Sequence, residues 1–203
     1  IDDKSNDNSV EILKKFKKKI IFAINKKKTR YGSYNQMNAY YQGYLKSKGK
    51  YLFFLDSDDY FKKNKVEVIM NEFKKKKVKL IFDLPIYKYR NKNINKIFKQ
   101  KKFIFSNWPR FSPQSCISLE RRYATEIFKK VMVKKFESVW FDFRIAIYHF
   151  LKNGNIYILK RYLTYYRQLE NSASKNYKFF SSNWWFRRNQ AHDIVSFFSS
   201  KLG

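Results

Sequence analysis

The first 84 residues alternate between short apolar runs and stretches with the period of an amphipathic helix. The apolar runs predict buried strands, at Lys19–Asn25, Tyr51–Leu55 and Val78–Leu84. The helical stretches lie before and between these runs, at Val10 to about Lys18, Gly32 to Gly49, and Lys65 to Lys75. This alternation predicts an α/β fold with crossover connections: a mostly parallel, doubly wound sheet with helices on both faces.

The second half of the chain has a less regular pattern. Pro85, Pro109 and Pro113 predict a loop-rich middle that includes KQKKFIFSNWPRFSPQSC, residues 99–116. Beyond it, the pattern predicts two helices and then one or two strands, at Glu120–Lys130, Phe141 to about Leu151, and Ile156–Tyr166. The stretch NWWFRRNQAHDIVSFFSSKLG indicates a terminal amphipathic helix. We therefore expect a domain of residues 1–174 with a C-terminal helical appendage, residues 175–203.

Acidic residues are scarce but gather after predicted strands. The chain has 16 Asp and Glu against 45 Lys and Arg, yet Asp56, Asp58 and Asp59 stand within four residues. Like charges this close repel one another unless a cation or backbone N–H groups neutralise them. Asp2 and Asp3 also follow the end of an expected strand. Ligands of doubly wound sheets bind beyond the carboxyl ends of the strands, so both clusters are predicted to lie at a binding edge.

The formal net charge of +29 raises a different class of function, a basic nucleic-acid-binding module. Such a module gathers basic residues on one face among stacked aromatic rings, whereas the lysine runs here are scattered. It also gives the acidic cluster no role. We favour a composition bias toward Lys, Asn, Ile, Phe and Tyr over nucleic-acid binding. The positive charge also favours peripheral contact with an anionic membrane, where each basic residue contributes about 1 kcal/mol of attraction.

Other features bear on location. Cys116 is the single cysteine, which excludes an internal disulfide and favours a reducing compartment. No apolar run reaches the roughly 20 residues of a membrane-spanning helix. We expect a cytoplasmic protein, either soluble or peripheral at the inner face of the membrane. Trp184 and Trp185, beside Arg187 and Arg188, would lie at that interface or pack the last helix onto the domain.

Three motifs, in this order and spacing, resemble family 2 glycosyltransferases with the GT-A fold. They are DDKSNDNS (residues 2–9), GYLKSKGKYLFFLDSDD (43–59), and WFDFR (140–144) followed by YRQLENSAS (166–174). The resemblance covers roughly Ile1 to Ser174. The family's first strand, of the type IIIPxYN, would precede Ile1, so the chain is expected to be N-terminally truncated. Val139 and Trp140 stand where many members carry Glu-Asp, which leaves Asp142 as the nearest acid.

The resemblance implies a role for each acid. Asp56 and Asp58 would hold Mn²⁺ or Mg²⁺, because hard oxygen ligands suit these cations. Asp142 would be the general base that deprotonates the acceptor hydroxyl. The implied donor-binding residues are Asp2, Asp3, Asp56, Asp59 and Arg167.

Structural readings of the same residues remain open. Asp58 or Asp59 can cap a helix, and Asp2 and Asp3 can stabilise a turn. Asp142 can be a helix N-terminal acid favoured by the macrodipole, with Arg144 as its partner. Arg167 can reach a diphosphate or close the domain.

The implied function is an inverting, metal-dependent transfer of a sugar from a nucleotide-diphosphate donor, with a UDP-sugar as the expected donor. The expected acceptor is a cell-surface glycan or a lipid-linked molecule. Two alternatives stay open at this point: the nucleic-acid-binding module, and an inactive glycosyltransferase remnant.

Overall fold

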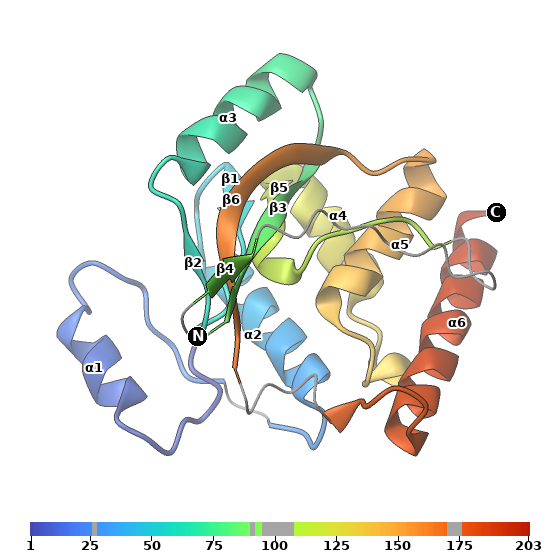
Figure 1. The fold of residues 1–203 in the computed structure, drawn as a ribbon, viewed down its shortest axis with the longest axis horizontal. Coiled ribbons are helices and arrows are strands. Elements are labelled where there is room, and N and C mark those ends of the chain that lie inside the picture. Colours follow the sequence, from blue (N-terminus) through green and yellow to red (C-terminus); the bar gives the residue numbers. More distant parts are fainter. Residues whose placement is uncertain (26–27, 90–91, 95–107, 170–175) are drawn as a thin grey trace.

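The computed structural model describes residues 1–25, 28–89, 92–94, 108–169 and 176–203, and it has helices on both faces of a central sheet (Figure 1). The α-helices are α1 (Ser9–Lys15), α2 (Gly32–Lys46), α3 (Lys65–Lys76), α4 (Arg121–Val131), α5 (Phe141–Asn153) and α6 (Ser182–Leu202). The strands are β1 (Tyr51–Phe53), β2 (Tyr60–Phe61), β3 (Leu80–Tyr89), β4 (Lys92–Ile94), β5 (Ile117–Glu120) and β6 (Ile158–Gln168). Two 3₁₀ turns are η1 (Gln114–Cys116) and η2 (Lys134–Phe136). Residues 99–107 of the expected loop and 170–174 of the last motif lie outside the described ranges.

The sheet is mixed, so the expectation of a mostly parallel sheet is wrong. Its strand order is β1-β5-β3-β6-β2, and β4 pairs with β3. Of the strand pairs in the described residues, β3–β6 is parallel and the other four are antiparallel. The prediction assumed that every strand follows a crossover helix. However, β2 follows the acidic loop and β5 follows η1, so neither strand is constrained to run parallel to its neighbour.

Two local expectations are also corrected. The run Lys19–Asn25 forms a single parallel bridge, between Asp2 and Ile24, rather than a full strand. Its backbone bonds are Asp2 N–H to Ala23 O (2.9 Å) and Asn25 N–H to Asp2 O (2.7 Å). Pro85 lies inside β3 rather than in a loop, where the pairing with β6 shifts register between Leu84 and Pro85. Proline lacks an N–H to donate, so strands accommodate it at such irregularities.

Alternating side chains divide the core between the two faces of the sheet. Leu52, Phe54, Leu80 and Phe82 belong to the large buried cluster, which α2, α4, α5 and α6 complete. On the other face, Ile81 packs with residues of α3, and Tyr51 and Phe53 cover that smaller cluster. This period of two is what a strand buried on both faces requires. The apolar runs Tyr51–Leu55 and Val78–Leu84 are therefore confirmed as sheet segments.

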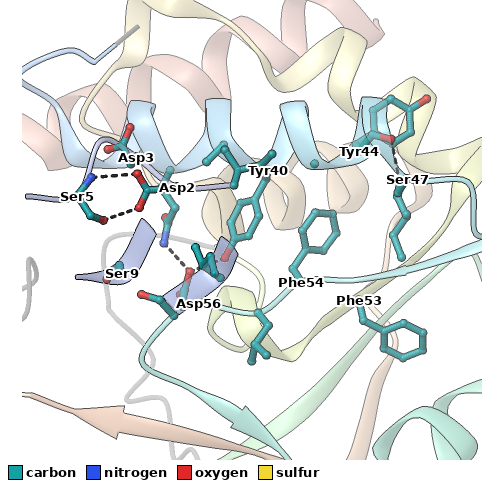
Figure 2. Close-up of a pocket in the computed structure, with 18 of the residues that line it drawn as sticks. Asp2, Asp3, Ser5, Ser9, Tyr40, Tyr44, Ser47, Phe53, Phe54 and Asp56 are labelled. Atoms are coloured by element: carbon teal, nitrogen blue, oxygen red, sulfur yellow. Dashed lines mark hydrogen bonds between the residues drawn. The ribbon is translucent and has the colours of Figure 1, made fainter. Parts of the chain in front are cut away.

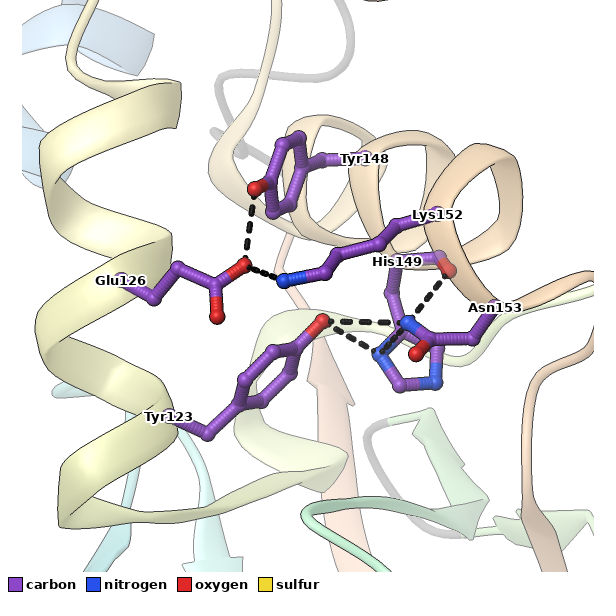
Figure 3. A network of polar contacts seen from close by, with 6 residues as sticks. All are labelled: Tyr123, Glu126, Tyr148, His149, Lys152 and Asn153. Carbon is purple, nitrogen blue, oxygen red and sulfur yellow. Dashed lines mark hydrogen bonds and ion pairs between the residues drawn. The ribbon is translucent and has the colours of Figure 1, made fainter. Parts of the chain in front are cut away.

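Helix α6 packs against α5 through buried Ala191, Ile194 and Phe198, and the Phe198 ring lies 5.5 Å from the Tyr148 ring. Between α4 and α5, six side chains make a network of polar contacts (Figure 3). In that network Tyr123 Oη lies 2.7 Å from His149 Nδ1, and Glu126 accepts from Tyr148 Oη at 2.8 Å. Burial lowers the pKa of His149 to about 4, so the imidazole is neutral at pH 7 and its role is structural.

None of the helices in the described ranges combines the length and the apolar character needed to cross a bilayer.

Candidate active site

A short acidic loop joins β1 to β2. We call residues 54–59 the acid loop. The N–H of Phe54 donates to Ile117 O at 3.2 Å, and the N–H of Asp56 donates to Ser115 Oγ at 3.0 Å. A turn then brings the N–H of Asp59 to Asp56 O at 3.1 Å. Because η1 and β5 hold its backbone, the loop presents its acids in a fixed arrangement.

The three acids of this loop converge. One carboxylate oxygen from each of Asp56, Asp58 and Asp59 lies within 4.8 Å of the others. Burial raises the pKa of Asp59 to about 6, and the neighbouring charges of Asp58 and Asp56 add to that rise. Burial likewise raises the pKa of Asp56, even though the Tyr40 hydroxyl donates to it. The loop therefore holds negative charge that the protein itself does not neutralise.

Buried polar atoms without hydrogen-bond partners surround the acid loop. In the described part of the chain they include Asp59 Oδ2, Gln36 Oε1 and Gln114 Oε1. Most buried polar atoms in proteins are hydrogen-bonded, so each exception needs a reason. Three converging carboxylates with an unpartnered buried oxygen are a hard-oxygen donor set of the kind that Mg²⁺ and Mn²⁺ prefer. The residues present fit a divalent cation.

Two tyrosines connect the acid loop to Asp142, the first-turn acid of α5. The charges of Asp56, Asp59 and Asp142 all act on the Tyr40 and Tyr166 hydroxyls, although burial is the main cause that raises both pKa values. The Asp142 carboxylate accepts the N–H of Phe143 at 2.7 Å. Burial raises the pKa of Asp142 to about 7, and the Asp56 charge contributes. The expected base and the expected metal ligands therefore belong to one electrostatic site.

A cavity of about 760 Å³ opens beside the acid loop, with Asp2, Asp3, Tyr40 and Asp56 among its lining residues (Figure 2). Asp2 accepts from Ser5 Oγ at 2.5 Å and from Ser5 N–H at 3.0 Å, and these bonds lower its pKa although burial opposes them. Asp3 accepts from Asn25 Nδ2 at 2.8 Å. The structure thus brings the first acidic motif and the acid loop to one cavity, with Asp2 engaged in its own turn.

The comparisons with known proteins decide the family. The model of the family "Glycosyl transferase family 2" matches residues 1–140. The chain belongs to glycosyl transferase family 2. The family expected from the sequence motifs is therefore confirmed, while the roles of individual site residues stay predictions. No curated protein matches the sequence of this glycosyltransferase chain.

Solved structures of S. aureus TarS share the fold of this family 2 chain. TarS 1-349 in complex with UDP-GlcNAc aligns with a TM-score of 0.61 and 14% identity, over 97% of this chain and 55% of that chain. Its complex with UDP gives 0.57 and 13%, over 97% and 59%. TarS 1-349 alone gives 0.54 and 12%, over 99% and 72%. The glycosyltransferase chain thus spans little more than half of the TarS segment bound to UDP-GlcNAc.

The structure shows the contacts of two arginines of the glycosyltransferase whose roles the sequence left undecided. Arg167, on β6, donates its backbone N–H to Asp59 Oδ1 at 2.9 Å and its guanidinium to the Asp58 carbonyl oxygen. It therefore braces the acid loop, with an exposed side chain at the edge of the site. Arg144 does not pair with Asp142. It is fully buried and donates to backbone carbonyl oxygens, including Val131 O at 2.7 Å and Val139 O at 2.9 Å.

A buried ion pair, which the sequence analysis missed, lies beneath the acid loop of the glycosyltransferase. Lys65 and Asp83 are both 0% exposed, and Lys65 Nζ lies 2.7 Å from Asp83 Oδ2. Lys65 also donates to Ser115 O at 2.8 Å and to Thr164 Oγ1 at 2.6 Å. A cation at the first residue of α3 opposes the helix macrodipole, and full burial adds a desolvation cost. We infer that Lys65 stays in this position because it holds Ser115. Lys65 donates to the Ser115 carbonyl oxygen, and the Ser115 hydroxyl accepts the N–H of Asp56 in the acid loop.

Proposed function

We propose that this chain is the donor-binding and catalytic part of an inverting glycosyltransferase that uses a UDP-sugar. The observation that carries the proposal is the convergence of Asp56, Asp58 and Asp59, with an unpartnered buried oxygen, next to an Asp142 whose pKa is about 7. Family membership and a fold like that of TarS, solved with UDP-GlcNAc, support the choice of donor. The acceptor is proposed to be a cell-surface glycan or a lipid-linked molecule.

In this proposal Asp58 and Asp56 hold Mn²⁺ or Mg²⁺, and the unpartnered oxygen of Asp59 faces the same charge. When bound, the cation supplies positive charge that neutralises the departing diphosphate. Asp59, Asp56 and Arg167 orient the donor from the acid-loop side. Asp2 and Asp3 bind the nucleoside from the opposite wall of the cavity, where Asp3 accepts a hydrogen bond from the base.

Asp142 acts on the acceptor. Its carboxylate takes the proton of an acceptor hydroxyl while that oxygen forms a bond to the anomeric carbon. The bond from the anomeric carbon to the diphosphate oxygen breaks on the opposite side, and the electron pair leaves with the nucleoside diphosphate. A base whose pKa lies near 7 is matched to this proton transfer at neutral pH. Attack opposite to the leaving group inverts the anomeric configuration.

Titration with UDP in the presence and absence of Mn²⁺ tests the donor site. We expect cation-dependent UDP binding in the wild-type chain, and no resolvable cation-dependent binding in Asp58→Asn, because one of the few carboxylates that hold the cation is lost. Asp193→Asn, an exposed acid on α6, is the matched control and should bind like the wild type. Equal UDP affinity in Asp58→Asn and the control would refute the cation site. UDP binding without any hydrolysis or transfer of UDP-sugars would instead favour the inactive remnant.

A further inference from the structure

A second cavity shares none of the lining residues given for the cavity beside the acid loop. Its volume is about 590 Å³, and its walls come from the start of α2, the segment before α5 and the start of α6. The lining residues include Arg30, Tyr31, Ser138, Tyr177, Lys178 and Phe186. Cations, hydroxyls and aromatic rings therefore face a common space, which is the mixture of groups that a polar ligand needs.

The charge of this second cavity has one sign. Among the described residues that line it, Arg30 and Lys178 are the charged ones, both exposed, and none is acidic. Arg30 Nη2 donates to Tyr31 Oη at 2.7 Å, which leaves the other guanidinium donors for a ligand. A concave surface lined by one sign of charge concentrates ligands of the opposite sign. The cavity therefore favours an anion.

Arg187 lies against one wall of this cavity, and its charge also acts on Asp142. Its guanidinium carbon lies 4.0 Å from the ring centroid of Tyr177, a wall residue of the cavity. Within the described residues this partly buried guanidinium makes no hydrogen bond or ion pair, although it carries five N–H donors. Its charge and that of Asp142 act on each other. An arginine with unused donors that contacts the wall of a basic cavity, and whose charge acts on the proposed base, is suited to bind an anionic group.

Hydrogen bonds fix the cavity relative to Asp142. Gln190, on α6 close to Arg187, accepts from Ser138 N–H at 2.9 Å and from Ser138 Oγ at 2.5 Å. Ser138 belongs to the cavity wall and precedes Asp142 by four residues. The start of α5 and the first turns of α6 are thus tied together, so a ligand in the cavity has a defined position relative to the base.

We propose that the second cavity receives the sugar acceptor, and that Arg187, with Arg30 and Lys178, binds an anionic group, phosphate or carboxylate, that the acceptor carries. The inference rests on the proposed function, in which Asp142 deprotonates the acceptor hydroxyl. The anionic group binds at Arg187, and the hydroxyl to be glycosylated lies on the Asp142 side of it. The site thus selects acceptors by charge before the chemistry takes place.

Ligand-observed NMR with glucose 6-phosphate and uncharged glucose, in the presence of UDP and Mg²⁺, tests the inference. We expect the wild-type chain to bind glucose 6-phosphate and to bind glucose at least about tenfold more weakly, since only the phosphate gains charge-assisted hydrogen bonds. Arg187→Gln should lower the affinity for glucose 6-phosphate about tenfold and leave UDP binding unchanged. Lys201→Gln, which removes one exposed charge at the far end of α6, should have no effect.

Three outcomes overturn the inference, and each has a distinct meaning. An equal loss in Lys201→Gln shows that the phosphate binds to the general positive charge. A matching loss of UDP affinity in Arg187→Gln assigns the guanidinium to the donor diphosphate. Unchanged glucose 6-phosphate binding in Arg187→Gln, with weaker binding to phosphatidylglycerol vesicles, assigns it to a membrane surface. Failure of the wild type to bind UDP refutes the proposed function instead, so the two failures are distinguishable. Thermal unfolding of each variant confirms that it is folded.

Discussion

The acid loop, residues 54–59, and the segment that joins α4 to α5, residues 132–140, are both irregular connections that lead to a site residue. Their polar groups are satisfied to very different extents. In the α4–α5 segment, the buried Arg144 guanidinium donates to the carbonyl oxygens of Val131, Val133, Phe136 and Val139. Beside the acid loop, Asp59 Oδ2, Gln36 Oε1 and Gln114 Oε1 are buried without a partner.

This difference separates structural from functional charge. Arg144 meets only backbone acceptors, and its pKa, lowered by burial to about 10, keeps it charged at neutral pH. Four of its five N–H donors bond backbone carbonyl oxygens, so it stabilises one conformation of the segment. The acid loop carries raised pKa values and unpartnered oxygens, which cost stability in the unliganded protein. We infer that substitutions in the first region reduce stability and those in the second reduce function.

Asp142→Asn should produce the largest effect, a loss of sugar transfer of about 10²–10⁴-fold, because the amide cannot accept the acceptor proton. In the wild type, transfer should rise with pH up to a plateau above pH about 7, where Asp142 is deprotonated. Rates of UDP release with a competent acceptor, measured from pH 5 to 9, check both points. A wild-type rate in Asp142→Asn would assign the base to another group.

Stability should respond in the opposite direction at Asp142. Its pKa is raised in the folded protein, so ionisation of the carboxyl group disfavours folding. The free energy of unfolding should therefore be highest at low pH, where the group is protonated, and should fall as pH rises through about 7. Asp142→Asn should therefore unfold at a higher urea concentration than the wild type at pH 8, and the gain should shrink toward pH 4. Equal urea midpoints at pH 8 would show that the carboxylate carries no such cost.

Arg144→Met should produce the second-largest effect, a loss of about 3 kcal/mol or more in the free energy of unfolding. The buried carbonyl oxygens it now bonds would lose their donor, and each such loss costs about 1–3 kcal/mol. UDP affinity at a temperature where the variant is folded should not change. Urea unfolding measures the first quantity, and Lys134→Met, an exposed cation of the same segment, is the control. A reduced UDP affinity in folded Arg144→Met would contradict the division between the two regions.

A double substitution at Lys65 and Asp83 should give the smallest effect and the sharpest test, because this ion pair connects a structural charge to the acid loop. Lys65→Met alone leaves Asp83 buried and unpaired, which is strongly destabilising. The double variant Lys65→Met, Asp83→Asn removes that unpaired charge and should recover most of the stability. Its cation-dependent UDP affinity should nevertheless stay about tenfold below wild type, as expected when support of metal ligands is lost. If the double variant binds UDP as tightly as the wild type, the pair has only a structural role.

Local patterns account for what the sequence predicted well. The acid loop follows β1 and Asp142 lies in the first turn of α5, because a strand end and a helix start depend on nearby residues. Pairing partners depend on distant residues, so β2 and β5 were not predicted as strands, and the expected strand at Lys19–Asn25 was wrong.

The residues missed at the site have the same explanation. Lys65 contacts Thr164, 99 residues away, and Arg187 approaches Asp142 across 45 residues, since 187 − 142 = 45. Lys65 has no neighbouring motif, and the aromatic residues beside Arg187 pointed to a membrane interface or to helix packing rather than to this site. The expected Arg144–Asp142 pair fails for a local reason, because residues two apart on a helix face different directions.

The buried Cys116 thiol can report local opening of the structure around η1. This single thiol follows Ser115, is 0% exposed, and has a pKa that burial raises well above the ordinary value. A thiol reagent can reach it only when η1 separates from the strands around it, since the reactive species is an exposed thiolate. The rate of modification therefore measures how often η1, which supports the acid loop, opens locally, as hydrogen exchange does for amides. Any ligand that binds the closed form slows that rate in proportion to its occupancy. The rate of Cys116 modification therefore reports donor binding in the unsubstituted protein.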